Sequence, residues 1–321
     1  MPNRPDPALP PSSILVTGAT GFIGRRLAAH LSEAGYRVRA AIRPERDHDD
    51  RVPPRCEQLP AGLTDPVALE KAIASCAAVV YCAGSVRGRG PQDFETANVH
   101  GVRAVVSALE RSPEPAPLLL LSSLAASRPE LSDYARSKAE GEAVLRQHPS
   151  LPWTILRPPA VYGPGDREML PMLKLAREGW LVRPGPSDQR LSLLHVDDLC
   201  AAVLAWLAMP EECLHQAYAI DDGTPGGYAW PDIGRALGHG NPRVLGLPRV
   251  LLNASARVNL LLSRLLQYAP MLTPGKAREL VQPAWLCDNS DFSAATGWKP
   301  SLDLERGADR LFESIGEATA G

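Results

Sequence analysis

Tyr134 and Lys138 are the residues whose types and spacing point most directly to chemistry. They lie four positions apart in the stretch SDYARSKAEGEAVL, residues 132–145. If this stretch is a helix, the phenol and the ammonium stand one turn apart on the same face. A neighbouring cation lowers the pKa of a phenol and readies it for proton transfer. The pair therefore indicates an acid–base site, and the alternative is ordinary surface chemistry on a solvated helix.

A second motif, TGATGFIG at residues 17–24, places glycines at positions 18, 21 and 24. An apolar run at 14–17 predicts a strand before it, and helical spacing at 22–31 predicts a helix after it. In that setting Gly18 permits a tight turn, Gly21 lets the backbone approach a pyrophosphate, and Gly24 brings the helix close to the sheet. Free amides at the start of the helix attract anionic oxygens. The motif thus predicts dinucleotide binding rather than a structural turn alone.

The elements that must position these motifs alternate between strand and helix. We expect strands at 36–42, 77–82, 118–121 and 153–158, and helices at 69–75, 98–109 and 132–145. The strands are apolar throughout, which is typical of a parallel sheet covered on both faces by helices. The predicted fold class is therefore α/β, and ligands of such sheets bind beyond the carboxyl ends of the strands.

The alternation fades after about residue 160, where Pro and Gly become frequent. We expect a dinucleotide-binding domain over residues 12–160 and a mainly substrate-binding lobe over residues 161–321. Segments near 190–210 should return to the first domain. The Pro-rich start, residues 1–11, is predicted to be a flexible tail.

Composition argues against several classes of partner. The formal net charge of −2 and the scattered arginines speak against nucleic acid. The six cysteines show no C-x-x-C spacing, which favours a reducing, cytoplasmic location. The chain has no run of about 18 apolar residues, so no membrane span is expected.

The stretch at residues 250–268 is rich in leucine but interrupted by Arg257, Asn259, Arg264 and Gln267. We expect a helix packed on the second lobe. The alternatives are a lid over an apolar substrate and a peripheral contact with a membrane surface.

The Gly-x-x-Gly-x-x-Gly spacing resembles that of the extended short-chain dehydrogenase/reductase family, the NAD(P)-dependent epimerase/dehydratase superfamily. Further motifs match in order along nearly the whole chain: YCAG at 81–84, Asn98 in ANVHG, Ser122 and Ser123, Y-x-x-x-K at Tyr134, RPPAVYGPGD at 157–166 and GWKPSLDLERG at 297–307. The resemblance implies a Rossmann-type doubly wound parallel sheet with a smaller C-terminal substrate lobe.

The resemblance also implies roles for individual residues. Tyr134 would be the acid in reduction and the base in oxidation, and Lys138 would stabilise the phenolate and reach the nicotinamide ribose. Ser123, rather than Ser122, would hydrogen-bond the substrate oxygen, and Asn98 would support the site. The implied cofactor contacts are Gly18, Thr20, Gly21, Phe22, Ile23, Gly24, Arg43, Leu63, Ala83, Gly84, Lys138 and Pro158.

The end of the second predicted strand bears on the choice of cofactor. An NAD site usually has a carboxylate there for the ribose 2′-hydroxyl, whereas a cation favours the 2′-phosphate of NADP. Here the carboxylate position falls on Ile42, and Arg43 follows it. We therefore expect NADP(H), with Arg43 as the phosphate partner and Arg39 as a second candidate, and NAD(H) as the alternative cofactor. Gly62 stands where the family usually has an aspartate near the adenine, which leaves the adenine contacts open.

The segment SLLHVDDL at residues 192–199 resembles a strand of many family members. Sugar-nucleotide members commonly carry a diphosphate-binding arginine four residues before its histidine, but that position is Leu191 here. Arg190, one residue away, would point to the opposite face of a strand. No other ligand lies at a persuasive spacing from His195, Asp197 and Asp198, so no metal site is expected.

These patterns favour an NADP(H)-dependent oxidoreductase that interconverts a ketone and a secondary alcohol on an apolar small molecule. The leucine-rich stretch and the segment after it are similar to the 3β-hydroxysteroid dehydrogenase and dihydroflavonol reductase-like branch. A nucleotide-sugar epimerase or dehydratase and a non-catalytic NAD(P)-binding sensor are the alternatives. The expected partner is a small-molecule substrate, and a homodimer is left open.

Overall fold

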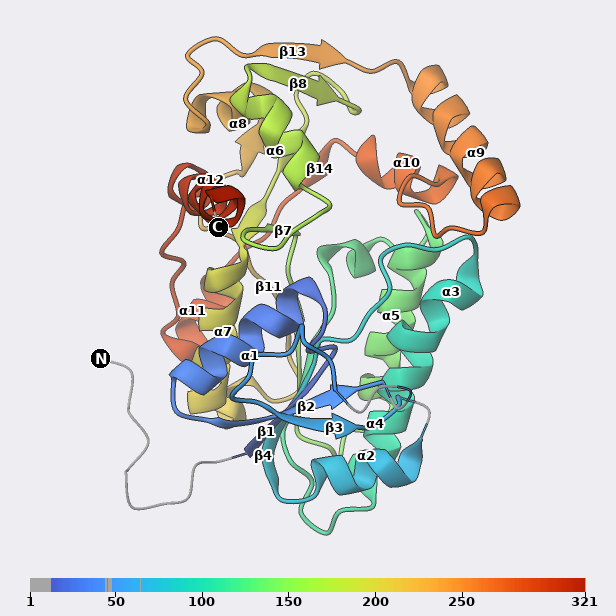
Figure 1. The fold of residues 1–321 in the computed structure, drawn as a ribbon, viewed down its shortest axis with the longest axis vertical. Coiled ribbons are helices and arrows are strands. Elements are labelled where there is room, and N and C mark those ends of the chain that lie inside the picture. Colours follow the sequence, from blue (N-terminus) through green and yellow to red (C-terminus); the bar gives the residue numbers. More distant parts are fainter. Residues whose placement is uncertain (1–12, 44, 46–47, 64, 321) are drawn as a thin grey trace.

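A single parallel sheet forms the centre of the protein, as the computed structural model shows (Figure 1). The structure describes residues 13–43, 45, 48–63 and 65–320; the tail expected at residues 1–11 lies outside them. The sheet has seven strands in the order β11-β6-β5-β4-β1-β2-β3, and every neighbouring pair is parallel. Their bounds are β1 Ser13–Thr17, β2 Arg37–Ile42, β3 Glu57–Pro60, β4 Cys76–Tyr81, β5 Leu118–Leu121, β6 Trp153–Arg157 and β11 Ala217–Ala219.

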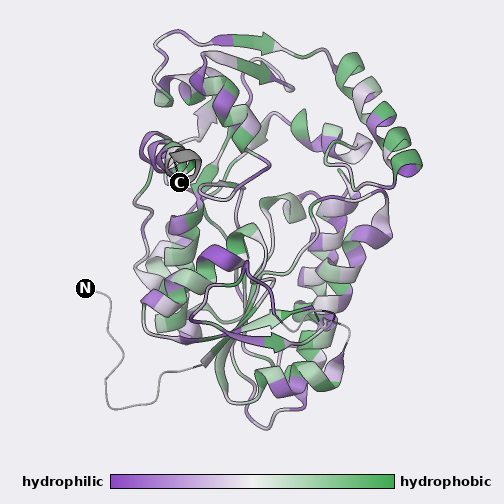
Figure 2. Cartoon of the chain, viewed as in Figure 1, coloured by the Kyte–Doolittle hydropathy of each residue, from purple (hydrophilic) through white to green (hydrophobic). Residues whose placement is uncertain are grey.

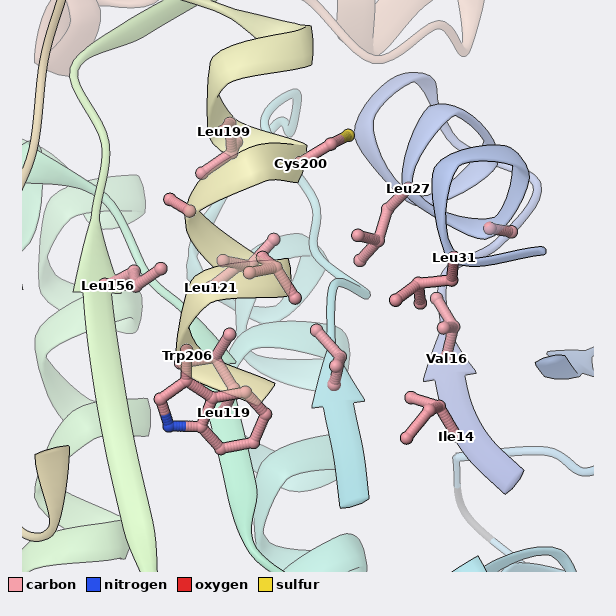
Figure 3. Close-up of a cluster of buried hydrophobic side chains, with 14 of the residues drawn as sticks. Ile14, Val16, Leu27, Leu31, Leu119, Leu121, Leu156, Leu199, Cys200 and Trp206 are labelled. Carbon is pink, nitrogen blue, oxygen red and sulfur yellow. The ribbon is translucent and has the colours of Figure 1, made fainter. Parts of the chain in front are cut away.

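Helices cover both faces of this sheet, which confirms the predicted Rossmann-type doubly wound α/β fold. One face carries α1 (Phe22–Glu33), α7 (Val196–Ala208) and α11 (Ser290–Thr296); Figure 3 shows Leu27 and Leu31 of α1 beside Val16 of the sheet. The other face carries α2 (Pro66–Ile73), α4 (Gly101–Glu110) and α5 (Asp133–Arg146). Because both faces are covered, strands such as β5, four buried leucines, are apolar throughout.

The rest of the chain forms smaller sheets and helices beyond the carboxyl edge of the central sheet (Figure 1). The strands pair as β7 (Ala160–Tyr162) with β10 (Leu193–His195), β8 (Trp180–Arg183) with β13 (Arg243–Gly246), and β9 (Arg190–Leu191) with β12 (Tyr228–Ala229) and β14 (Ala284–Trp285). The helices are α6 (Leu170–Arg177), α8 (Trp230–Ala236), α9 (Arg249–Leu266), α10 (Pro274–Leu280) and α12 (Leu304–Ala320). A 3-10 turn at Pro210–Cys213 lies elsewhere, beside the start of β6, where the Cys213 carbonyl accepts from Thr154 Oγ1 at 2.9 Å.

The expected division of the chain near residue 160 stays a prediction. The structure shows that α7, β11 and α11, all later than residue 160, pack on the central sheet. Trp206 of α7 illustrates this, because its indole is fully buried and donates to Thr154 Oγ1 of β6 at 3.0 Å.

Some elements differ from the sequence-based expectation. The helix expected at 98–109 begins at Gly101, after α3 (Pro91–Glu95) and a π-helical turn at Thr96–His100. The helix expected to reach Ser75 ends at Ile73, because Ser75 has a left-handed backbone with φ of 63°. Strand β3 has a half-buried, partly polar pattern and was not predicted.

The leucine-rich helix exists, as α9, but it packs through few of its apolar side chains. Leu252 and Ala256 contact Ala277 of α10, whereas most of its other leucines and valines are exposed. The preferred expectation of a packed helix therefore holds for one face only. Across the part of the chain that the structure describes, no helix is both long and apolar enough to cross a membrane.

Candidate active site

The predicted site residues gather along one edge of the central sheet, because each follows a different parallel strand. Gly18 directly follows β1, Arg43 follows β2 and Pro158 follows β6. The others come within three residues of a strand end: Leu63 after β3, Ala83 and Gly84 after β4, and Ser123 after β5. Parallel strands end at one edge, so residues far apart in sequence meet there.

The glycine-rich turn between β1 and α1 has the shape that close backbone approach requires. Gly18 has φ of 68°, and a Cβ on it would lie 2.7 Å from the backbone N and Cα of Ala83. A Cβ on Gly24 would lie 2.2 Å from the Gly18 carbonyl oxygen. These two positions therefore exclude any side chain and hold α1 close to the strand ends.

The start of α1 suits an anionic group. Gly21 is exposed, and α1 begins there without a side-chain cap, so the first amides at Phe22 and Ile23 face no capping oxygen. Thr20 lies half-buried in the same turn. The geometry of this edge thus fits the pyrophosphate of a dinucleotide.

Tyr134 lies in the first turn of α5, beside Ser123, which follows β5. Ser123 caps the 3-10 turn Leu124–Ser127 through a 3.2 Å bond from the Ala125 amide, and its hydroxyl also interacts with the Tyr134 phenol. Burial raises the pKa of Tyr134 to about 12, and the Ser123 interaction opposes that shift. The expectation that Lys138 would lower this pKa is wrong for the protein by itself. The phenol is therefore protonated at neutral pH, which is the form that can donate a proton.

Lys138 lies one turn along the helix with its ammonium buried. Its Nζ donates to the Leu121 carbonyl at 3.0 Å, and burial lowers the pKa of Lys138 to about 8. A Cβ on Gly84 would stand 3.2 Å from this Nζ and 3.0 Å from Asn98 Oδ1. Gly84 therefore leaves room at the point where Lys138 and Asn98 converge.

The Asn98 side chain, in the π-helical turn, is held by three hydrogen bonds. Its Nδ2 donates to the Ser85 carbonyl at 3.1 Å and to Ser137 Oγ at 2.9 Å, while its Oδ1 accepts from the Ser85 amide at 3.2 Å. A Cβ on Gly141 would lie 2.2 Å from the Asn98 carbonyl oxygen. Helix α5 therefore approaches the backbone of Asn98 so closely that no side chain fits at position 141.

Glu142 is a functional candidate that sequence reasoning missed. This fully buried carboxylate accepts from Ser122 Oγ at 2.6 Å and from Arg157 Nε at 2.8 Å, and Arg146 pairs with it at 3.0 Å. Burial opposes ionisation, yet Arg157 and Ser122 together keep the pKa of Glu142 below its usual value. The Ser122 hydroxyl is therefore engaged by Glu142. The sequence signal that could have identified Glu142 is its position four residues after Lys138, on the same face of α5.

Three further neighbours of Tyr134 come from distant segments. The Phe94 ring of α3 packs edge-on at 6.1 Å between centroids, and Lys276 Nζ of α10 lies 5.9 Å from the Tyr134 ring centroid. Glu279 pairs with Lys276 at 2.8 Å and accepts from Ser132, the cap of α5. No sequence pattern signals these contacts, because α10 lies more than a hundred residues from α5.

The end of β2 offers one free arginine for a cofactor phosphate. Arg43 is exposed, and within residues 13–43, 45, 48–63 and 65–320 it makes no ion pair or hydrogen bond. Arg39, the second candidate, is occupied, because its guanidinium donates to the carbonyls of Ala72 at 2.7 Å and Ala74 at 2.9 Å. Leu63 packs half-buried near Gly101, and Pro158 is buried with its carbonyl accepting from Leu124.

The polar residues singled out at positions 190, 197 and 198 serve the fold. Arg190 donates to the carbonyls of Gly226 at 2.5 Å and Gly227 at 3.0 Å. Asp197 binds Arg26 of α1 at 2.6 Å, and Asp198 accepts from the Ser301 amide at 3.0 Å. No group of three or more potential ligands for a metal ion occurs among the described residues.

A cavity of about 520 Å³ borders the site. Ser85, which bonds Asn98, lines it together with Arg89 of the following loop and with Gln267 and Tyr268 at the end of α9. The cavity thus connects the end of α9 with the loop that holds Asn98.

Comparisons with known proteins agree with this geometry. The model of the NAD dependent epimerase/dehydratase family matches residues 14–220. The chain is 33% identical over 315 residues to ceramide reductase of Caulobacter vibrioides, covering 94% of this chain and 97% of that protein. It is 28% identical over 334 residues to 2-alkyl-3-oxoalkanoate reductase of Stenotrophomonas maltophilia, covering 93% and 98%.

Solved structures show the same fold at lower identity. A UDP-glucuronic acid 4-epimerase from Bacillus cereus, in complex with UDP-glucuronic acid and NAD, superposes with a TM-score of 0.68 at 19% identity, covering 95% of this chain and 99% of that one. Since the family model spans most of the chain and the reductase relatives span nearly all of it, the chain belongs to the NAD-dependent epimerase/dehydratase family and is an NAD(P)-dependent oxidoreductase of the extended short-chain dehydrogenase/reductase type.

Proposed function

We propose that the protein interconverts a ketone and a secondary alcohol on an apolar chain, with NADP(H) as its preferred cofactor. The observation that carries this proposal is the placement of a half-buried, protonated phenol, Tyr134, beside Ser123 and one helical turn from Lys138. A bound nicotinamide would supply or accept the hydride.

The protein's own groups would manage the proton and the developing charge. In reduction, the neutral Tyr134 hydroxyl donates its proton to the oxygen that becomes the alcohol. The Ser123 hydroxyl donates a hydrogen bond to the same oxygen and stabilises its negative charge as it forms. Lys138, held by the Leu121 carbonyl, brings a positive charge to the space beside Gly84, where a ribose would lie.

The preference for NADP(H) rests on Arg43. Its side chain is exposed at the carboxyl end of β2, and no carboxylate takes the place of Ile42 before it. A guanidinium binds a 2′-phosphate through charge-assisted hydrogen bonds, whereas its hydrogen bond to an uncharged ribose hydroxyl is much weaker. NAD(H) would then bind more weakly.

Two lines of support favour a substrate with an alkyl chain. The relatives named above are a ceramide reductase and a 2-alkyl-3-oxoalkanoate reductase, and a 3-oxoalkanoate is a ketone on an alkyl chain. In addition, Arg190 is bonded to the Gly226 and Gly227 carbonyls, so it does not offer its charge to a sugar diphosphate.

Turnover of a chosen ketone tests the proposal. The full chain should oxidise NADPH with a long-chain 3-oxoacyl amide or ester, and should do so faster than with a short-chain analogue. Tyr134→Phe should lower kcat by about 1,000-fold or more, as loss of a general acid and its hydrogen bond does, while NADPH still binds. Full activity in this variant would reject the proton role of Tyr134.

The same assay separates the alternative reaction. A nucleotide-sugar epimerase would convert UDP-glucose without net consumption of NADPH, and product analysis would reveal it. This alternative is tested because solved structures of epimerases share the fold of this chain. Conversion of UDP-glucose with no ketone reduction would overturn the proposal.

A further inference from the structure

Helix α9 presents an apolar face to solvent instead of to the protein. Its inward face carries Leu252, Ala256 and Ser263, which pack against the region of α10. On the opposite side, Val250, Leu261 and Leu265 are 78%, 60% and 70% exposed. Residues 250, 254, 258, 261 and 265 recur at helical spacing and form one continuous outward stripe. Figure 2 shows this helix at the outer edge of the molecule with much of its surface green.

The outward stripe is wide and aliphatic. Leu251, Leu262 and Leu266 broaden it, and each is exposed by more than two fifths. Core positions of protein interfaces are enriched in aromatic residues and methionine, and leucine and valine are under-represented among their hot spots. A face made of valine, leucine and one alanine suits hydrocarbon better than it suits a second protein.

Charge distinguishes this region from the rest of the chain. Residues 233–278 contain no aspartate or glutamate and seven lysines and arginines, although the whole chain has a net charge of −2. Arg257 and Arg264 flank the apolar stripe of α9, and neither forms an ion pair in the described part of the chain. Two copies of α9 packed together would bring arginine near arginine with no acid to match. An anionic lipid surface offers the complementary charge.

The helix also ends at the cavity that borders the site. Gln267 and Tyr268 line the cavity that Ser85 shares, and Arg89 donates to Gln267 Oε1 at 2.6 Å. On its inner side α9 packs on α10, whose Lys276 lies over Tyr134 (Figure 1). A surface that covered the outward stripe would therefore lie next to the cavity opening.

We propose that the outward face of α9 docks on a membrane surface that contains anionic lipids. The apolar stripe enters the boundary between headgroups and acyl chains, and Arg257 and Arg264 contact phosphates at its edge. The contact is peripheral and leaves the rest of the fold outside the bilayer. It depends on the surface of α9 and not on the reaction proposed above.

Cosedimentation of the full chain with vesicles tests this docking. The protein should bind vesicles of phosphatidylcholine with phosphatidylglycerol, bind phosphatidylcholine alone more weakly, and lose binding as salt rises. The double variant Leu261→Gln with Leu265→Gln should bind more than about tenfold more weakly, because two exposed leucines no longer leave water. Replacing Arg257 and Arg264 by Gln should weaken binding to anionic vesicles by about thirtyfold.

Matched variants control for general surface effects. Val67→Gln with Leu214→Gln changes exposed apolar residues elsewhere, and Arg55→Gln with Arg103→Gln removes two exposed arginines elsewhere; both should bind like the wild type. The proposal is overturned if the wild type ignores anionic vesicles, or if the α9 variants bind as well as it does. A dimer that dissociates in the Leu261→Gln, Leu265→Gln variant without any vesicle binding would also overturn it. Since no turnover is measured, failure here is distinct from failure of the proposed reaction.

Discussion

Burial acts in opposite directions on the two titratable groups of the candidate site. It raises the pKa of Tyr134 to about 12 and lowers the pKa of Lys138 to about 8, because each shift favours the uncharged form. The phenol is thereby kept as a proton donor, and the ammonium is kept near its point of titration. Both effects belong to single residues and can be tested by single substitutions.

The adjacent serines should separate catalysis from stability. Ser123→Ala removes the hydroxyl beside Tyr134 and should lower kcat/KM by about 100-fold or more, as loss of one donor to a forming oxyanion does. Ser122→Ala removes a hydrogen bond to the buried Glu142 and should cost about 1–3 kcal/mol of unfolding free energy with activity little changed. Steady-state kinetics and urea unfolding of both variants check this contrast; equal activity losses would contradict it.

Replacing the buried lysine should stabilise the protein while it damages the site. The pKa of Lys138 falls from 10.5 to about 8 on folding, so below about pH 8 the folded protein must hold a buried charge. Lys138→Met should therefore raise the unfolding free energy by about 1–3 kcal/mol at neutral pH. The gain should shrink as pH rises from about 8 to 10.5, because the wild-type lysine becomes neutral and its stability recovers.

Urea unfolding across this pH range measures the difference between the two proteins. Lys174→Met, at an exposed position of α6, provides the control and should show no such pH dependence. A Lys138→Met gain that does not change with pH would show that the charge is not its cause.

At the scale of elements, the site depends on how closely α5 approaches the π-helical turn. Gly141 faces the Asn98 carbonyl, and the turn in α5 before it carries Ser137 and Lys138. The π-helical segment also directs the Asn98 side chain toward the Ser85 carbonyl. A change in the spacing of these two elements would therefore move Lys138 and Asn98 together.

Gly141→Ala should test that dependence. The added methyl would meet the Asn98 carbonyl oxygen at 2.2 Å, so α5 must shift. Overpacking of this kind costs about 1–3 kcal/mol, and kcat should fall with it. Gly316→Ala in α12 meets nothing within 4 Å and should raise stability by up to about 1 kcal/mol with activity unchanged. Unfolding and kinetics of the two variants measure this, and a neutral Gly141→Ala would contradict the close approach.

For the whole molecule, cofactor binding should couple segments that lie far apart in the chain. The proposed site draws residues from the ends of β1, β2, β4, β5 and β6, so a bound dinucleotide would hold the sheet edge together. Ligand binding to the folded state alone adds to stability by mass action.

A thermal shift should reveal this coupling. NADPH at about 100 times its Kd adds about 2.7 kcal/mol, which corresponds to a rise in Tm of about 4 °C for a chain of this length. At the same concentration NADH should raise Tm less. Arg43→Ala should remove most of the NADPH shift and leave the NADH shift unchanged. Equal loss of both shifts would reject Arg43 as the 2′-phosphate partner.

Much of this organisation was readable from the sequence, because local patterns carry it. Apolar runs without alternation indicate buried parallel strands, and glycines at 18, 21 and 24 follow such a run and open a helix. Parallel strands end at one edge, so the sequence alone predicts that Gly18, Arg43, Gly84 and Ser123 lie along the same edge. These conclusions depend only on the chain's local periodicity and on strand direction.

The tertiary structure alone decided what surrounds those residues. Burial reversed the expected pKa shift of Tyr134, and Arg39 was taken by carbonyls of α2, since desolvation and competing partners arise only when distant segments pack. Lys276 and Glu279 reached Tyr134 from α10 for the same reason. The sequence also predicted α9 as a helix, but which of its faces lies inward depends on α10, and that contact left its leucines facing out.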